Sequence, residues 1–218
     1  EWAKGAVMYQ IYVDRFCNGN RGNDVVDNEY VYIGHPVRQV QEWDSNPEPM
    51  DVRRFYGGDL QGVLDKLNYI QSLGVTAIYF NPLFVSPSNH KYDIQDYEHI
   101  DPHFGVIIEN GKSLVEPDGT GNENAEKYVA RTASRENLEA SDALFLQLVK
   151  EMHRRGMRVI IDGVFNHCGS FNKWLDRERI YEREGSYESG AYVSFDSPYH
   201  TFFHFNENRP ENWPYNGS

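Results

Sequence analysis

The stretch Val159-Ile-Ile-Asp162-Gly-Val-Phe-Asn166-His167 is the part of the chain that best indicates the fold class. An apolar run passes directly into an acid, an amide and an imidazole, which is typical of a buried parallel strand that ends at a polar site. At the carboxyl end of a barrel strand, such side chains would point into the mouth of the barrel. A single Asp or His at a strand end is a satisfied hydrogen-bonding residue about as often as a catalytic one, so both interpretations stay open for this stretch alone.

Two more apolar runs, residues 7–13 and 75–80, predict buried strands of the same kind. An amphipathic helix is predicted between each pair of strands. Apolar residues recur at three- and four-residue spacing over residues 60–73 and again over residues 144–152. Strands and helices that alternate in this way predict a right-handed parallel α/β arrangement.

The ends of both predicted helices carry capping residues. Asp59 stands at the N-cap position of the first helix and Gly74 at its end. Ser141 or Asp142 can cap the second helix, and Gly156 ends it. Since each glycine leads directly into a strand, the long connections all leave the carboxyl ends of the strands. Barrels and open α/β sheets both build their sites at that edge.

Two of the long connections differ in composition. The loop between Val106 and Ala140 contains the polar run 117–124, which predicts a mobile surface excursion. The segment after Cys168 instead carries many aromatic residues, from Phe171 to Tyr215. A solvated linker would not hold so many aromatic side chains, so we predict a small subdomain that packs over the strand ends.

Composition excludes some classes of partner. The formal net charge is −12, which disfavours nucleic acid and anionic membrane surfaces, because both are bound through Lys and Arg. No apolar run is long enough to span a bilayer, and we find no signal peptide. The chain begins at Glu1, so we expect that a preceding segment was removed. Two cysteines, Cys17 and Cys168, neither form a disulfide scaffold nor indicate a compartment.

Short oxygen-bearing side chains alternate with glycines just after the first predicted strand, in Asn18-Gly-Asn20-Arg-Gly-Asn23-Asp24. Calcium binds six to eight oxygens of carboxylates, amides and carbonyls, and glycines allow a loop to curl around such an ion. An ordinary Asn/Gly turn has the same composition. The stretch alone therefore leaves a calcium site and a simple turn as alternatives.

Two further stretches lie at strand exits or helix starts. Residues 55–62, Phe-Tyr-Gly-Gly-Asp-Leu-Gln-Gly, lie at the start of the first predicted helix. They indicate a helix N-cap preceded by a glycine hinge. Residues 86–105 follow the second strand and combine Ser, Asn, His, Tyr and Asp, which indicates a loop that faces a site.

Together these four stretches resemble glycoside hydrolase family 13, the α-amylase family, and most closely its neopullulanase and cyclomaltodextrinase branch. Residues 7–16 look like the first barrel strand of the family, and residues 162–167 match its first conserved region. The resemblance implies a partial (β/α)8 TIM barrel. Residues 1–167 would form the first three β/α units, and residues 168–218 would be an incomplete small domain that the family inserts after strand three.

The resemblance also implies roles for single residues. His167 resembles the histidine that hydrogen-bonds the sugar in the innermost donor subsite and stabilises the transition state. Asp162 resembles the strand-end acid that supports this subsite, and Tyr92 the tyrosine whose ring stacks beneath the sugar. A calcium site of this branch would be formed by six residues: Asn18, Asn20, Asn23, Asp24, Gly57 through its carbonyl, and Asp59.

The implied function is retaining hydrolysis of α-1,4-glucosidic bonds in maltodextrins, cyclodextrins or pullulan, with an α-glucan oligosaccharide as the partner. The family's nucleophile and general acid are expected beyond Ser218, so the chain alone is expected to be inactive and either to self-associate or to be one piece of a longer chain. A transglycosylase of the family and a non-catalytic glycan-binding homologue are the alternatives. A doubly wound nucleotide-binding domain is disfavoured, because no Gly-x-Gly-x-x-Gly or P-loop follows a strand.

Overall fold

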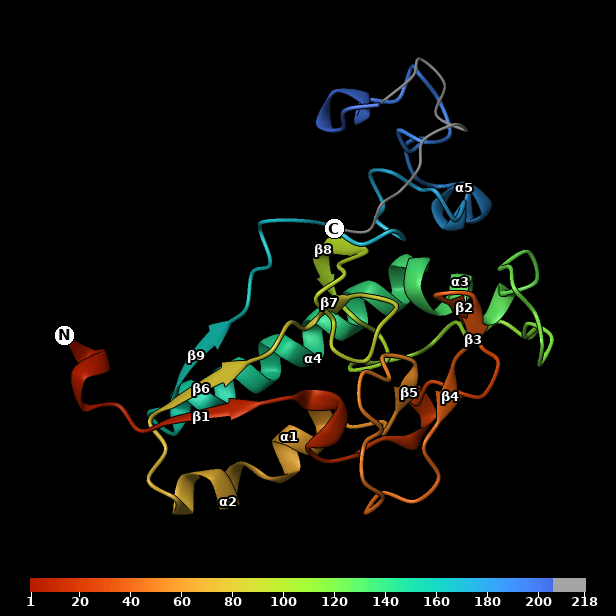
Figure 1. Cartoon of the computed structure of the whole chain (residues 1–218). Coiled ribbons are helices and arrows are strands. Elements are labelled where there is room, and N and C mark those ends of the chain that lie inside the picture. Colours follow the sequence, from red (N-terminus) through yellow and green to blue (C-terminus); the bar gives the residue numbers. More distant parts are fainter. Residues whose placement is uncertain (206–218) are drawn as a thin grey trace.

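A three-stranded parallel sheet forms the centre of the computed structural model, which describes residues 1–205 (Figure 1). Its strands are β1 (Met8–Ile11), β6 (Ala77–Phe80) and β9 (Arg158–Ile161), in the order β1-β6-β9. Met8 pairs with Ala77, and Ala77 pairs with Arg158, so the strands run in register. The three predicted strands and their parallel order are confirmed.

Helices α1 (Leu60–Asp65) and α2 (Leu67–Ser72) connect β1 to β6, where the sequence predicted one helix. The helix divides at Lys66, whose backbone leaves α geometry at φ −96° and ψ 1°. The predicted N-cap is confirmed, because the Asp59 carboxylate accepts a hydrogen bond from the Gly62 amide at 2.6 Å. The apolar face of both helices is fully buried against the sheet through Leu60, Val63, Leu67 and Ile70.

Helix α4 (Arg135–Arg154) connects β6 to β9 and begins about two turns before the position that the sequence predicted. The prediction that Ser141 or Asp142 caps this helix is wrong. Ser141 is fully buried inside the helix, where its hydroxyl donates to the Asn137 carbonyl at 2.7 Å. Asp142 accepts instead from the Ile100 amide at 2.9 Å.

Helix α3 (Glu126–Ala133) lies in the connection for which the sequence predicted only a mobile excursion. The polar run 117–124 is exposed along most of its length, but Asn122 within it is only 8% exposed. Tyr128 and Val129 of α3 are buried in a second hydrophobic cluster. The prediction is therefore wrong for Asn122 and α3, which are fixed parts of the fold.

Short elements complete the described chain. Three two-strand pairs are formed by β2 (Val31–Tyr32) with β3 (His35–Pro36), β4 (Arg38–Gln39) with β5 (Arg54–Phe55), and β7 (Phe84–Val85) with β8 (Asp96–Ile100). Helix α5 spans Ile180–Glu184, and short 3-10 turns lie at Trp2–Gly5, Val13–Arg15, Arg21–Asn23 and His200–Phe202. No helix within residues 1–205 has the length and apolar character needed to cross a membrane.

The chain after β9 lies beyond the carboxyl ends of the strands, on the side of β7 and β8 (Figure 1). Phe171 and Tyr181 join the second hydrophobic cluster. Trp174 stacks on Tyr97 with ring centroids 5.5 Å apart. Residues 206–218 of the predicted small domain, with Trp213 and Tyr215, lie outside the described residues, and the domain boundary at residue 168 stays a prediction.

Candidate functional site

Asp162 immediately follows β9 and accepts hydrogen bonds from two tyrosines. The Tyr79 hydroxyl, from the neighbouring strand β6, lies 2.7 Å from Asp162 Oδ2. The Tyr92 hydroxyl, from the loop between β7 and β8, lies 3.0 Å from the same oxygen. The carboxylate therefore joins the ends of two adjacent strands to the loop that leaves one of them.

His167 contacts the same loop from the other side. Its Nε2 lies 2.9 Å from the backbone carbonyl oxygen of Tyr92. Since a carbonyl only accepts hydrogen bonds, this contact requires the proton on Nε2. The His167 side chain is exposed. The structure thus brings together the three residues that the sequence singled out, with Tyr92 in contact with both Asp162 and His167.

The backbone between β9 and His167 is held by Tyr97. The Tyr97 hydroxyl donates to the carbonyl oxygens of Val164, at 3.0 Å, and His167. Val164 has a positive φ of 36°, which is unusual for a β-branched residue and marks the sharp turn after the strand. Tyr97 in β8 therefore fixes the turn that presents His167.

A buried ion pair fixes the loop that carries Tyr92. Lys91 is 1% exposed, and its Nζ lies 2.6 Å from Asp101 Oδ2 and 2.8 Å from the Ser86 carbonyl. The Tyr92 amide donates to His90 Nδ1 at 3.0 Å, so this nitrogen of His90 is unprotonated. Burial lowers the pKa of His90, in agreement with a neutral ring.

The hydroxyls of Tyr79 and Tyr92 must be protonated to donate to Asp162, and their pKa values agree with this. The hydrogen bond to Asp162 raises the pKa of Tyr79 to about 12. Burial and the same carboxylate raise the pKa of Tyr92. Both hydroxyls therefore stay protonated at neutral pH and remain donors to Asp162. The sequence did not single out Tyr79; its only signal was a hydroxyl-bearing residue inside an apolar strand.

The predicted calcium residues converge around the start of α1. Asn18 Nδ2 donates to Asp24 Oδ1 at 2.8 Å, and Asp59 accepts from the amides of Gly19, Asn20 and Gly62. The Asn20 side chain instead accepts from the Gly22 amide, and Asn23 Nδ2 donates to the Gly105 carbonyl. The loop after β1 and the helix start are thus tied together by these side chains.

Two observations in this cluster fit a cation. The side-chain oxygens of Asn18 and Asn23 are buried and have no hydrogen-bond partner in the described part of the chain. Gly57 has a φ of 81°, and a Cβ there would lie 2.5 Å from Asp24 Oδ1. Only glycine can bring its backbone this close to the Asp24 carboxylate. Burial first, and then the charge of Asp59, raise the pKa of Asp24 to about 6.

A second cluster of acidic residues is already paired with the ammonium group of a lysine. Asp96, Glu98 and His99 bring ligand atoms within 4.8 Å of one another. Lys173 Nζ lies 2.9 Å from Asp96 Oδ1 and also pairs with Glu98, while His99 pairs with Asp142. Because the ammonium group occupies the position between the carboxylates, we assign no metal to this group.

Comparison with known proteins identifies the family. A family model for the catalytic domain of α-amylase matches residues 10–116 and 140–217. The chain belongs to the α-amylase family. The central sheet therefore represents three strands of the family's (β/α)8 barrel, as the sequence predicted, and the resemblance to the neopullulanase and cyclomaltodextrinase branch is confirmed.

The α-amylase relatives include proteins named for several activities. Neopullulanase 2 of Thermoactinomyces vulgaris is 40% identical over 169 residues, which cover 78% of this chain and 21% of the relative. An intracellular maltogenic amylase of Bacillus subtilis is 38% identical over 177 residues, which cover 81% of this chain and 22% of the relative. The chain spans about a fifth of the length of these curated relatives.

Solved α-amylase-family structures give the same result. The type III pullulan hydrolase of Thermococcus kodakarensis superposes with a TM-score of 0.61 and 30% identity, and the match covers 93% of this chain and 28% of that one. A cyclic α-maltosyl-(1→6)-maltose hydrolase of Arthrobacter globiformis, in complex with maltose, gives 0.62 and 27%, over 95% of this chain and 33% of that one.

Proposed function

We propose that the protein that carries this chain hydrolyses α-1,4-glucosidic bonds of maltodextrins, cyclodextrins or pullulan with retention, and that this chain forms part of the donor subsite. The observation that carries this proposal is the contact of Tyr92 with both Asp162 and His167, at the carboxyl ends of parallel strands. The α-amylase relatives include a neopullulanase, a cyclomaltodextrinase and a pullulan hydrolase, and these activities support the substrate class.

In this proposal Tyr92, Asp162 and His167 each make a different contribution to the binding of one glucose ring. Asp162 fixes the hydroxyl of Tyr92, and therefore the plane of the ring on which the apolar face of the sugar stacks. His167 uses Nε2 to hold the Tyr92 carbonyl, which leaves Nδ1 for a sugar hydroxyl. A contact of this kind accelerates the reaction if it is stronger in the transition state than in the ground state.

Retaining hydrolysis also needs a nucleophile and a general acid, whose carboxyl groups stand about 5 Å apart across the scissile bond. In this proposal neither carboxylate is among the residues assigned here to the donor subsite. The residues within this chain then bind and orient the donor sugar, and no step of bond cleavage is assigned to them.

We further propose that the loop after β1 binds calcium. The ligands would be side-chain oxygens of Asn18, Asn20, Asn23, Asp24 and Asp59 with the carbonyl of Gly57, and the two unpartnered amide oxygens support this set. The ion would neutralise the two buried carboxylates and connect the loop to the N-terminus of α1. Its role is structural and distinct from the sugar contacts of Tyr92.

The test is product analysis with the protein that carries this chain. We expect release of maltose from β-cyclodextrin and maltotriose, and of panose from pullulan. The α-anomer of each product should form first, as seen by ¹H NMR. Products longer than the substrate would favour the transglycosylase instead. Tight binding of maltotriose without turnover would replace the enzyme with a glycan-binding homologue.

A further inference from the structure

A segment outside the family match forms part of a cavity beside His167. The family model matches residues on both sides of 117–139 but not this segment. The segment is nevertheless firmly packed: the Tyr128 ring of α3 lies 3.9 Å from the Tyr30 ring, and its hydroxyl donates to Gln95 Oε1 at 2.7 Å. The segment outside the family match is therefore a fixed wall of the fold.

Asn122 of this segment joins three separate parts of the chain. Its Oδ1 accepts from the Val31 amide at 2.7 Å, and its Nδ2 donates to the Val31 carbonyl at 3.0 Å. The same Nδ2 lies 3.2 Å from Glu178 Oε2, and Arg183 donates to the Asn122 carbonyl at 2.6 Å. Asn122 thus connects hairpin β2–β3 to the segment that follows β9.

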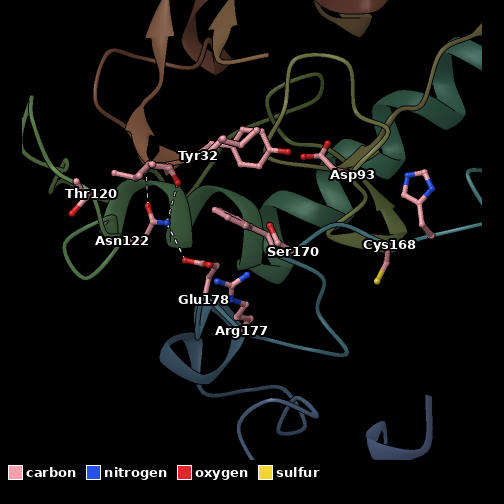
Figure 2. Close-up of a pocket in the computed structure, with 13 residues that line it drawn as sticks. Tyr32, Asp93, Thr120, Asn122, Cys168, Ser170, Arg177 and Glu178 are labelled. Carbon is pink, nitrogen blue, oxygen red and sulfur yellow. Dashed lines mark hydrogen bonds between the residues drawn. The ribbon is translucent and has the colours of Figure 1, made fainter. Parts of the chain in front are cut away.

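These three parts surround a cavity of about 590 Å³, which lies in the size range of small-molecule sites. Figure 2 shows Thr120, Asn122, Arg177 and Glu178 at one end of it and Asp93 and Cys168 toward the other. His167 lines the cavity as well. A ligand in the cavity would therefore lie directly next to the sugar proposed to bind at Tyr92 and His167.

The lining combines hydrogen-bonding groups with apolar surface. Hydroxyl, carboxylate and guanidinium groups come from Thr120, Glu178 and Arg177. Ile33, at the tip of the hairpin, is 66% exposed and has a φ of 49°, which is rare for a β-branched residue. A pyranose ring presents hydroxyls at its edge and C–H groups on its faces, so a lining with both kinds of surface matches it.

We propose that this cavity binds a glucose unit of the α-glucan adjacent to the unit held by Tyr92 and His167. The inference rests on the proposed function, because it assumes the same substrate. It adds a specific consequence: recognition of longer α-glucans depends on the segment 117–139, which lies outside the family match, together with Glu178.

The test compares affinities for glucose and for S-linked maltose and maltotriose, which resist hydrolysis, by calorimetry with the protein that carries this chain. We expect affinity to rise with length. In Glu178→Gln, which keeps an acceptor for Asn122, the rise from glucose to maltose should shrink about tenfold while glucose affinity stays unchanged, because a charged hydrogen bond is lost. Thr120→Val, at an exposed position, should reduce the rise about threefold.

The matched control is Glu182→Gln on α5, an exposed residue outside the cavity, which should behave as wild type. If both cavity variants keep the full gain with length, the cavity does not bind the glucan, and the proposed function is unaffected. If the wild-type protein binds no S-linked oligosaccharide and cleaves no α-glucan, the proposed function fails and the inference fails with it.

Discussion

Arg131 donates a hydrogen bond from Nη1 to the backbone carbonyl of Asp24 at 2.8 Å, across 107 positions of sequence. The same nitrogen lies 2.8 Å from Glu29 Oε2, and Nε donates to Asn110 Oδ1. Arg131 belongs to the segment outside the family match, whereas Asp24 belongs to the predicted calcium loop. Helix α3, which lies outside the family match, therefore supports this loop directly.

The substitution Arg131→Met should destabilise the fold by about 3–5 kcal/mol, because it removes one partner of a buried ion pair. Both side chains are almost fully buried. Urea unfolding monitored by circular dichroism measures the loss. Arg154→Met is the matched control, since Arg154 forms an exposed ion pair with Glu151 and should cost at most about 1 kcal/mol. Equal losses in the two variants would show that α3 does not depend on Arg131.

Removal of calcium should lower the melting temperature, because an ion that binds only the folded state stabilises it by mass action. At a concentration 100 times the dissociation constant, the stabilisation is about 2.7 kcal/mol. The measurement is a thermal melt in EGTA, with calcium and then with magnesium restored. Asp24→Asn should abolish the response to calcium, whereas the exposed Asp44→Asn should keep it. Identical melting curves with and without calcium would exclude the site.

His103 should make stability depend on pH. Its Nε2 lies 2.7 Å from Glu29 Oε1 and its Nδ1 2.9 Å from Asp101 Oδ1, so both contacts are hydrogen bonds only when the ring is protonated. Burial opposes protonation, but the two carboxylates outweigh it and raise the pKa of His103 above its usual value. The stabilisation by His103 is then complete below pH ~6.5 and is lost as the pH rises through the raised pKa.

The corresponding variant is His103→Gln. Its loss of stability relative to wild type should be about 3 kcal/mol at pH 6 and should become smaller toward pH 10, as measured by urea unfolding across this range. His153→Gln, at an exposed position of α4, is the control and should show no such trend. A loss that stays constant over the whole range would mean that the ring is neutral between its two carboxylates.

Much of the barrel could be predicted because local patterns coincide with the tertiary structure. The three strands are apolar runs, and Asp59 caps α1 from its own sequence neighbourhood. Ser141 misled the prediction because a serine before an apolar stripe looks like an N-cap. In the fold it packs against Gly105, where a Cβ would come within 2.4 Å of it. No local signal encodes that approach.

The missed site features depend on partners that are distant in sequence. Asn122 is buried because it pairs with both backbone groups of Val31, 91 positions away. In the sequence it is one polar residue within a polar run. In the sequence, Tyr79 is simply one residue of an apolar run. Its hydrogen bond to Asp162 follows only from the position of Asp162 at the end of the adjacent strand. Strand neighbours had to be known before this pair could be found.

Tyr79→Phe should reduce kcat in the protein that carries this chain by about tenfold, because Asp162 would lose one of its two phenol donors and hold Tyr92 less firmly. Initial rates on β-cyclodextrin give the value. Tyr69→Phe, on the exposed side of α2, is a matched control that should leave the rate unchanged. A wild-type rate in Tyr79→Phe would show that Tyr92 alone positions the carboxylate.

His167→Asn should lower kcat more than it weakens substrate binding, because the proposed contact with the sugar strengthens in the transition state. Asn is too short to replace the Nε2 contact with the Tyr92 carbonyl, but the Tyr92 hydroxyl still donates to Asp162 and the Lys91–Asp101 pair still holds the loop. Steady-state kinetics on maltotriose separate the two effects: kcat and kcat/KM should fall together while KM changes little. If only KM rises, His167 binds the ground state and the transition state equally, and its proposed role in stabilising the transition state is wrong.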